Sequence, residues 1–161
     1  MEINNTNNKG SINKAIDLIK SNIIDFVWPF GYCKNSVDID NNKKLLNKQF
    51  DKVYTTINYT AEETPGGIIV CNTDKFLEAG GLSDHIKRYG PEDKEFKLRI
   101  QKLGYNIARL NEYYLYHLWH PTPDDYRFKK DNMTDANSEE YESTKNMRPH
   151  HLKRIYPPIF K

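Results

Sequence analysis

The sequence predicts an α/β or α+β fold, in which short strands alternate with helices along the chain. Three observations support this prediction. Apolar residues recur at helical spacing over 12–21, short apolar runs rich in β-formers occupy 23–30 and 68–71, and glycines separate the later elements. With 161 residues, the chain is long enough for one domain with a hydrophobic core of its own.

The first half of the chain is predicted to begin with a helix and a strand. Residues 1–10 are polar and rich in asparagine, so we expect them to be disordered. Ser11 is a suitable N-cap for a helix over 12–21. A β-rich strand follows over 23–30. The remaining segments are predicted, in order, as a polar connection, a helix near 42–50 and an irregular stretch over 51–65.

Glycine and proline divide the second half into clearer elements. Thr73 can cap a short helix, which the pair Gly80-Gly81 can end. Phe96, Ile100 and Leu103 share one face of a later helix, so we expect that face to be buried. The predicted elements are a strand over 68–71, helices over 74–79 and from Pro91 to Gly104, strands over 105–110 and 113–119, a helix near 138–147 and a proline-containing tail.

The composition excludes several classes of protein. Lys and Arg number 24 against 22 Asp and Glu, and a net charge of +2 argues against a nucleic-acid partner. No apolar run reaches the roughly 18 residues of a membrane span, and the N-terminus does not resemble a signal peptide. Cys33 and Cys71 lack the spacing of a zinc site or a disulfide framework. We therefore expect a cytoplasmic protein without a membrane span.

Three clusters have residue types suited to chemistry, and none is decisive alone. They are Thr64-Pro65-Gly66-Gly67, Gly90-Pro91-Glu92-Asp93 and His117-Leu118-Trp119-His120-Pro121. The paired glycines allow a ligand to approach the backbone closely, or they form an ordinary turn before a strand. Carboxylates in a first helical turn are stabilised by free N–H groups, which explains them without a function. The same field keeps a carboxylate ionised, as a general base requires.

The two histidines have a structural alternative as well. His117 and His120 would point to opposite faces of a continued strand, so both are not expected to bind one ion. One of them could complete a metal site whose other ligands lie elsewhere. Either could instead have only a structural role at the end of the strand.

The order and spacing of these clusters closely resemble the C-terminal region of galactosyltransferase-like GT-A enzymes. That group includes the β-1,4-galactosyltransferases, the polypeptide N-acetylgalactosaminyltransferases and the chondroitin-polymerase families. Their pattern is a Gly-Gly strand, a Gly-x-Glu-Asp segment, a helix carrying Arg, a Gly, and a His after a strand. The matching pieces are Gly66–Gly81, Tyr89–Phe96, Arg99, Lys102–Tyr105 and Tyr116–Pro121, with weaker matches at Ala15–Lys20 and Asp25–Phe30.

The resemblance implies a fold and a domain arrangement. The chain would be the C-terminal part of a GT-A, Rossmann-like fold, with a short mixed sheet flanked by helices. The N-terminal nucleotide-binding half is apparently missing. A partial glycosyltransferase domain would then occupy 11–150, with a tail over 151–161.

The resemblance also implies roles for single residues. Asp93 would be the catalytic base that takes the proton of the acceptor hydroxyl, and Glu92 would hold the acceptor or the donor sugar. Tyr89 would contact the acceptor. The residues that would face the donor sugar are Gly66, Gly67 and Trp119. His117, or alternatively His120, would bind Mn²⁺, which neutralises the departing diphosphate.

One departure from the family concerns the metal. GT-A enzymes grip the cation with an Asp-x-Asp motif. Asp38-Ile39-Asp40 has that spelling but follows the strand over 23–30, so we interpret it as coincidence. Mn²⁺ binding is therefore expected only with a complete nucleotide-binding half, which a separate chain could supply, so a test of Mn²⁺ binding needs that half to be present. Without that half, four apolar side chains would be exposed, or covered by a partner or by rearranged helices: Phe26, Trp28, Ile68 and Val70.

Two hypotheses of function remain, and a third is weaker. The first is a partial catalytic domain that transfers a hexose from a UDP-sugar to a glycan or related hydroxyl acceptor, with inversion. The alternative is an inactive remnant or split-enzyme half that acts as an acceptor-binding module, and the absent metal motif favours it for the isolated chain. A metal-dependent hydrolase using Asp93, His117 and His120 is disfavoured because their spacing forms no compact ligand motif.

Overall fold

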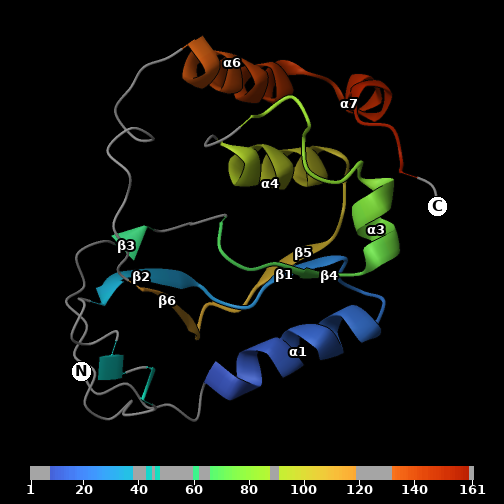
Figure 1. Ribbon diagram of the computed structural model, residues 1–161. Helices are drawn as coiled ribbons and strands as arrows, with labels where there is room; N and C mark the ends of the chain where they lie inside the picture. Colours follow the sequence, from blue (N-terminus) through green and yellow to red (C-terminus); the bar gives the residue numbers. More distant parts are fainter. Residues whose placement is uncertain are drawn as a thin grey trace. The chain divides into compact units, whose positions relative to one another are not determined.

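A computed structural model of the chain describes residues 8–37, 43–44, 46–47, 60–61, 66–87, 91–118 and 132–159. In these parts the protein is of the mixed α/β type, as predicted (Figure 1). The chain divides into two compact units. Unit 1 comprises Met1–Asn22, Val27–Val70 and Ala108–Pro121, and unit 2 comprises Ile23–Phe26, Cys71–Ile107 and Thr122–Lys161.

One three-stranded sheet has the order β4-β1-β5. Its strands are β4 (Val70–Cys71), β1 (Phe26–Trp28) and β5 (Ile107–Arg109). All three fall within the predicted strands but are shorter than expected. β1 is buried at every position, which agrees with its continuous apolar sequence. Each strand has residues in both units.

The second sheet belongs to unit 1 and has the order β3-β2-β6. β2 (Tyr32–Val37) runs parallel to β6 (Tyr114–Leu118) and antiparallel to β3 (Thr60–Ala61). The sheet is therefore mixed, with a register irregularity between Asn35 and Val37. Only β6 was predicted. The expectations of a polar connection at β2 and of irregular chain at β3 were wrong, because pairing with β6 organises a segment that has no apolar run of its own.

Helix α1 (Asn8–Lys20) begins four residues earlier than predicted. Ser11 therefore lies inside the helix and is buried, so its prediction as the N-cap was wrong. Ala15 is fully buried, as the helical pattern predicted, whereas Ile12 is 39% exposed. In the same unit, Lys14 forms an ion pair with Glu112, in the turn between β5 and β6.

Gly31 joins β1 to β2 at a point where two backbone segments of unit 1 nearly touch. Its N–H donates to the carbonyl of Tyr113 at 2.9 Å, and the N–H of Leu110 donates to the carbonyl of Trp28 at 3.0 Å. A Cβ at position 31 would lie 2.4 Å from the Cα of Asn111. Only glycine fits there.

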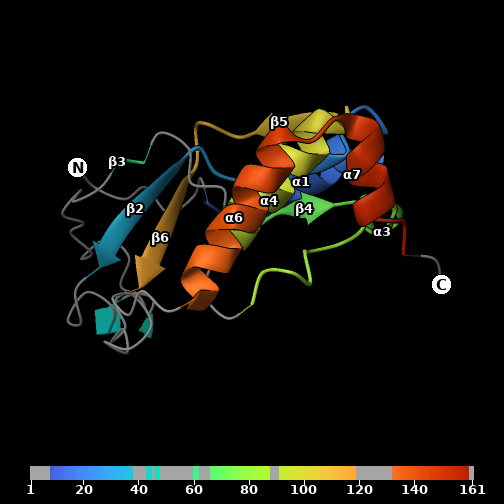
Figure 2. The same ribbon diagram turned by 90° about the horizontal axis from the view of Figure 1, so that it is seen from above.

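Unit 2 contains four of the helices that the structure describes. They are α3 (Thr73–Glu78), α4 (Glu92–Lys102), α6 (Asn132–Asn146) and α7 (Pro149–Ile155). Figures 1 and 2 show α6 running beside α4, and the two helices are in contact. α7 was predicted as tail, which was wrong. Proline at its first position is favourable for a helix start.

Glycine ends both α3 and α4, as predicted. Gly80 and Gly81 have φ values of 83° and 64°, and the N–H of Gly81 donates to the carbonyl of Phe76 at 3.0 Å. Gly104 has φ 83° and closes α4 in the same manner. The N-cap of α3 is Asn72, whose side chain accepts from the N–H of Asp74, so the prediction of Thr73 was wrong.

The four apolar side chains predicted to be exposed or covered by other elements differ in their burial. Phe26 and Trp28 are buried. Within unit 2, Phe26 packs edge-on against Phe96 and Tyr105, with ring centroids 5.6 and 5.4 Å away. Residues of the chain itself therefore cover it. Ile68 remains 43% exposed, and Val70 is half-buried.

Candidate active site

The first turn of α4 presents two neighbouring carboxylates. Glu92 opens the helix and Asp93 follows it, while Pro91 is the N-cap rather than the first helical residue that was predicted. Pro91 makes no side-chain capping hydrogen bond to the backbone N–H groups of this turn. Their partial positive charge favours anionic groups at this position.

One oxygen of Glu92 is buried without compensation. Among the described residues, Oε2 of Glu92 has no hydrogen-bond partner although it is shielded from solvent. An unpaired buried acceptor costs about 1–3 kcal/mol, so native structures rarely keep one without a reason. A ligand hydroxyl would be a suitable donor for this oxygen.

The carboxyl group of Asp93 has a raised pKa. Partial removal of its hydration, with a smaller contribution from the negative charge of Glu92, raises the pKa of its carboxyl. The side chain nevertheless remains exposed, so it can reach a bound molecule. A carboxylate with a raised pKa accepts a proton more readily than an ordinary aspartate.

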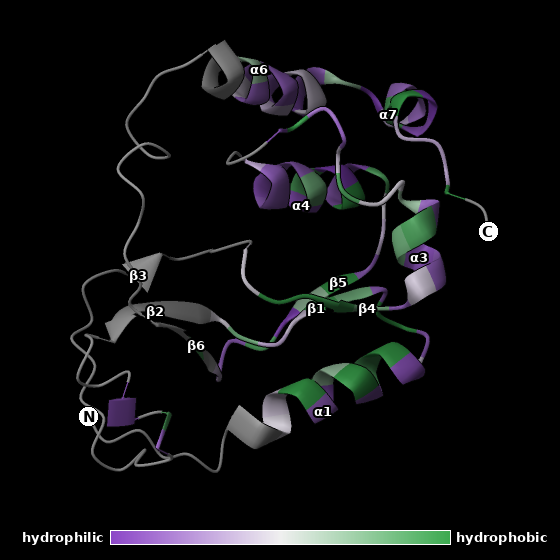
Figure 3. Cartoon of the chain, in the orientation of Figure 1, coloured by the Kyte–Doolittle hydropathy of each residue, from purple (hydrophilic) through white to green (hydrophobic). Residues whose placement is uncertain are grey.

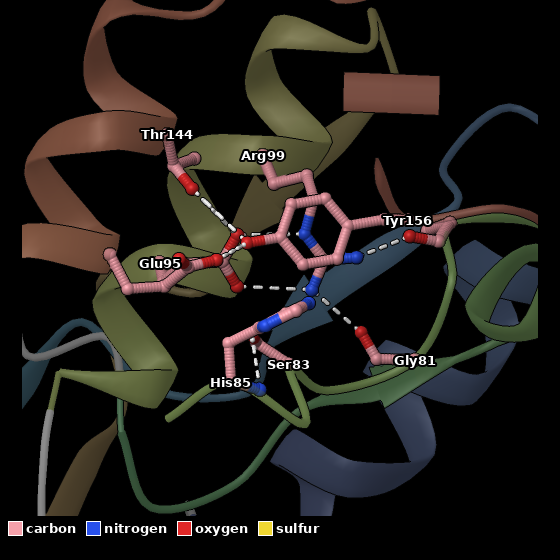
Figure 4. Close-up of polar contacts among 9 residues, drawn as sticks. Gly81, Ser83, His85, Glu95, Arg99, Thr144 and Tyr156 are labelled. Carbon is pink, nitrogen blue, oxygen red and sulfur yellow. Dashed lines mark hydrogen bonds and ion pairs between the residues drawn. The ribbon is translucent and has the colours of Figure 1, made fainter. Parts of the chain in front are cut away.

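Directly behind this turn, α4 carries a buried ion pair (Figure 4). Glu95 and Arg99 are both 0% exposed and lie one helical turn apart. Nε of Arg99 donates to Oε1 of Glu95 at 2.8 Å, and a second guanidinium nitrogen donates to Oε2 at 3.0 Å. Both carboxylate oxygens of Glu95 are therefore satisfied, in contrast to Oε2 of Glu92.

Arg99 also ties α4 to the turn that ends α3. Its guanidinium donates to the carbonyl of Ala79 and, at 2.7 Å, to the carbonyl of Gly81. The guanidinium also stacks on the ring of Tyr156, with Cζ of Arg99 4.0 Å from the ring centroid. The arginine of the family pattern thus has a structural role here, fixing the helix that bears Glu92 and Asp93.

The C-terminal helices complete this buried cluster. Thr144 of α6 donates to Oε1 of Glu95 at 3.3 Å and lies 3.3 Å from the hydroxyl of Tyr156, which donates to Glu140. Burial, with the hydrogen bond to Glu140, raises the pKa of Tyr156 to about 12. Sequence reasoning missed Glu95, Thr144 and Tyr156. The four-residue spacing of Glu95 and Arg99 was a signal for the ion pair.

A second contact from α6 fixes the loop that leads to α4. The buried amide of Asn137 accepts from the N–H of Lys87 at 3.0 Å and donates to its carbonyl at 2.8 Å. Two bonds to the backbone N–H and C=O of one residue hold the loop as a strand partner would. The loop is therefore anchored five residues before Glu92.

The predicted donor and metal positions lie in unit 1. Gly67 has φ 103°, and a Cβ there would lie 2.5 Å from Cδ2 of Leu115 in β6. The φ value favours glycine, whereas the end of the Leu115 side chain could move aside. Backbone conformation therefore explains Gly67 without a sugar, and its binding role stays a prediction. His117 is paired with Asn35 in the ladder of β2 and β6. Gly66 is half-buried.

The other predicted site residues, Tyr89, Trp119 and His120, lie outside the described residues, as does the Asp38-Ile39-Asp40 sequence. Within the described part of the chain, no group of three His, Cys, Asp or Glu residues could hold a metal ion. The side chains described here therefore do not by themselves provide a Mn²⁺ site. No helix in the same residues is long and apolar enough to cross a membrane.

Comparison with known families now identifies the segment that carries Gly66, Gly67, Glu92, Asp93 and His117. A family model described as the N-terminal domain of galactosyltransferase matches residues 48–121. Residues 48–121 form a galactosyltransferase-family segment. The resemblance to galactosyltransferase-like enzymes is thereby confirmed, while the assignment to their C-terminal region stays a prediction. No curated protein and no solved structure matches the chain significantly.

The galactosyltransferase-family segment does not include α6 and α7. Those helices nevertheless supply Asn137, Thr144 and Tyr156, which hold the loop and the ion pair behind the two carboxylates. A family of this kind implies a sugar donor and an acceptor as partners.

Proposed function

We propose that the chain is part of a hexosyltransferase of GT-A fold, that Glu92 and Asp93 form its acceptor side, and that it works in the cytoplasm. The donor would be a UDP-hexose and the acceptor a glycan or related hydroxyl compound. The observation that supports this proposal is the carboxylate pair in the first turn of α4. It lies inside the galactosyltransferase-family segment, with one unpaired buried oxygen and one raised pKa.

The proposed reaction is a single displacement with inversion. The acceptor hydroxyl attacks the anomeric carbon, a carbon–oxygen bond forms, and the bond from that carbon to the diphosphate breaks. The hydroxyl proton passes to the carboxylate of Asp93, and UDP leaves. General-base catalysis of this kind contributes about 10²–10⁴-fold to the rate.

Glu92 would orient the acceptor by accepting a hydrogen bond at its unpaired oxygen. Because that oxygen has already lost its water, binding a hydroxyl removes an existing cost. Glu92→Gln should therefore raise the acceptor KM more than it lowers kcat.

We further propose that donor binding depends on a divalent cation, with His117 as one ligand. Support comes only from the family resemblance, and no step of the transfer is derived through the ion. Calorimetric titration with UDP, with and without Mn²⁺ and with the nucleotide-binding half present, tests this part. Metal-dependent binding that His117→Ala removes is expected, and binding of UDP that is indifferent to Mn²⁺ would contradict it.

The transfer itself is tested by supplying UDP-hexoses and sugar acceptors and measuring released UDP and glycosylated product. Asp93→Asn should lower kcat by about 10²–10⁴-fold while UDP binding persists. Asp74→Asn is the matched control, since Asp74 is also an exposed aspartate in the first turn of a helix in unit 2. Equal activity of the two variants would refute the role of Asp93.

The alternative proposal is an acceptor-binding module without turnover. The absence of a metal cluster among the described residues favours it for the isolated chain. Saturable binding of acceptor, sensitive to Glu92→Gln, with neither transfer nor hydrolysis of the donor, would select this alternative.

A further inference from the structure

The C-terminal region concentrates the positive charge of the protein. Residues 143–161 contain five Lys or Arg and neither Asp nor Glu, a formal charge of +5. The rest of the chain holds the other 19 cationic side chains against all 22 acidic ones, a formal charge of −3. A nearly neutral protein therefore has a strongly asymmetric charge distribution.

Three of these cations stand on α7 and at its start. Arg148, Lys153 and Arg154 are exposed, while Leu152 is 0% exposed and attaches the helix to unit 2. Within the described residues, none of the three cationic side chains has a hydrogen bond or an ion pair. Lys145 differs, since it is paired with Glu142 at 3.3 Å.

Exposed apolar side chains adjoin these cations. Ile155 is 37% exposed and Ile159 is 50% exposed. Ile159 packs close to Gly81, since its Cδ1 lies 3.1 Å from the position that a Cβ would take at that glycine. Leu82, the next residue after Gly81, is 52% exposed. Figure 3 shows α7 as mostly hydrophilic, with a hydrophobic part. Charge and apolar surface thus occur together at this end of the chain.

We propose that this surface, made of Arg148, Lys153, Arg154, Ile155 and Ile159 and called the α7 surface, binds the face of an anionic lipid bilayer. Unpaired cations are attracted by negatively charged headgroups, and exposed aliphatic side chains gain by entering the interface. A single-stranded nucleic acid would match the charge, but such partners are held by stacked aromatic side chains rather than by isoleucine.

The expected effect follows from the number of cations. Each Lys or Arg near an anionic surface raises the partition coefficient about fivefold, so removing three lowers it on the order of 100-fold. The attraction is screened by salt because the Debye length falls from about 10 Å at 0.1 M to about 3 Å at 1 M.

The test is cosedimentation of the full chain with vesicles of neutral phosphatidylcholine, with and without roughly one third phosphatidylglycerol. We expect salt-sensitive binding to the anionic vesicles only. The variant R148Q/K153Q/R154Q should lose it on the order of 100-fold. The matched control K20Q/K87Q/K94Q removes the same charge from exposed lysines elsewhere and should bind like the wild type.

Thermal unfolding serves to check that both triple variants are folded, which we expect because the substituted positions are exposed. Ile155→Ser and Ile159→Ser together should lower the part of the binding that persists at high salt. Equal losses in the two triple variants would overturn the proposal, because net charge alone would then explain binding. Binding to an oligonucleotide without binding to anionic vesicles would also overturn it.

Discussion

Replacing Arg99 by methionine is expected to destabilise unit 2 severely. Methionine has a similar volume but no hydrogen-bond donors, so Glu95 would remain fully buried without its cation. The carbonyls of Ala79 and Gly81 would also lose their hydrogen-bond donor. Removing one partner of a buried ion pair typically costs about 3–5 kcal/mol. Domains of this size have about 5–15 kcal/mol of stability, so roughly a fifth or more of it would be lost.

A double variant distinguishes the stranded charge from lost packing. In Glu95→Leu/Arg99→Met the buried carboxylate is gone, and well-packed apolar replacements for buried ion pairs are often neutral or stabilising. The double variant should therefore be clearly more stable than Arg99→Met alone. Arg99→Lys keeps the charge but cannot make the forked contact with Glu95, and it should fall between methionine and the wild type.

Urea unfolding followed by far-UV circular dichroism measures these differences as free energies of unfolding. The reasoning would be refuted if Arg99→Met cost less than about 1 kcal/mol, the value of an ordinary hydrogen bond. It would also be refuted if the double variant were no more stable than the single one, because the cost would then lie in packing.

Three further perturbations have expected results. The pKa of Asp93 is raised in the folded protein, so the ionised carboxylate lowers the free energy of unfolding at neutral pH. Asp93→Asn should therefore raise that free energy near pH 7, and the gain should vanish below about pH 4 in urea titrations at different pH values. The pKa of Tyr156 is raised to about 12 in the folded protein, so wild-type stability should fall from pH 10 to 12 by about 2 kcal/mol more than that of Tyr156→Phe. Gly31→Ala forces a Cβ onto the backbone of Asn111 and should lower the melting temperature, at a cost of about 1–3 kcal/mol or more; an unchanged melting temperature would contradict the close approach.

Helices α3 and α4 of unit 2 could be predicted because glycines specify their C-terminal ends locally. Gly80 and Gly104 need the left-handed conformation, and Phe96 and Ile100 mark the buried face of α4. A few residues are enough to fix such features. The prediction of the carboxylate pair in the first turn of α4 depended on the same local rules.

Elements that depend on distant partners could not be predicted in this manner. β2 has no apolar run and becomes a strand through its pairing with β6, some 80 residues away. The spacing of Glu95 and Arg99 predicts an ion pair on a helix, but such pairs usually lie at the surface. Only the packing of Thr144 and Tyr156 from the C-terminal helices makes it a buried one.

The three carboxylates in the first turn of α4 differ in a way that bears on function. Glu95 receives two bonds from Arg99 and one from Thr144, so the fold can satisfy a buried carboxylate fully at this helix. Glu92 and Asp93, within three residues of it, have an unpaired buried oxygen and a raised pKa instead. Stability alone would favour replacing them, since each imposes a cost that a neutral side chain would not. Under the proposed function, the acceptor hydroxyl would supply the donor that Oε2 of Glu92 lacks.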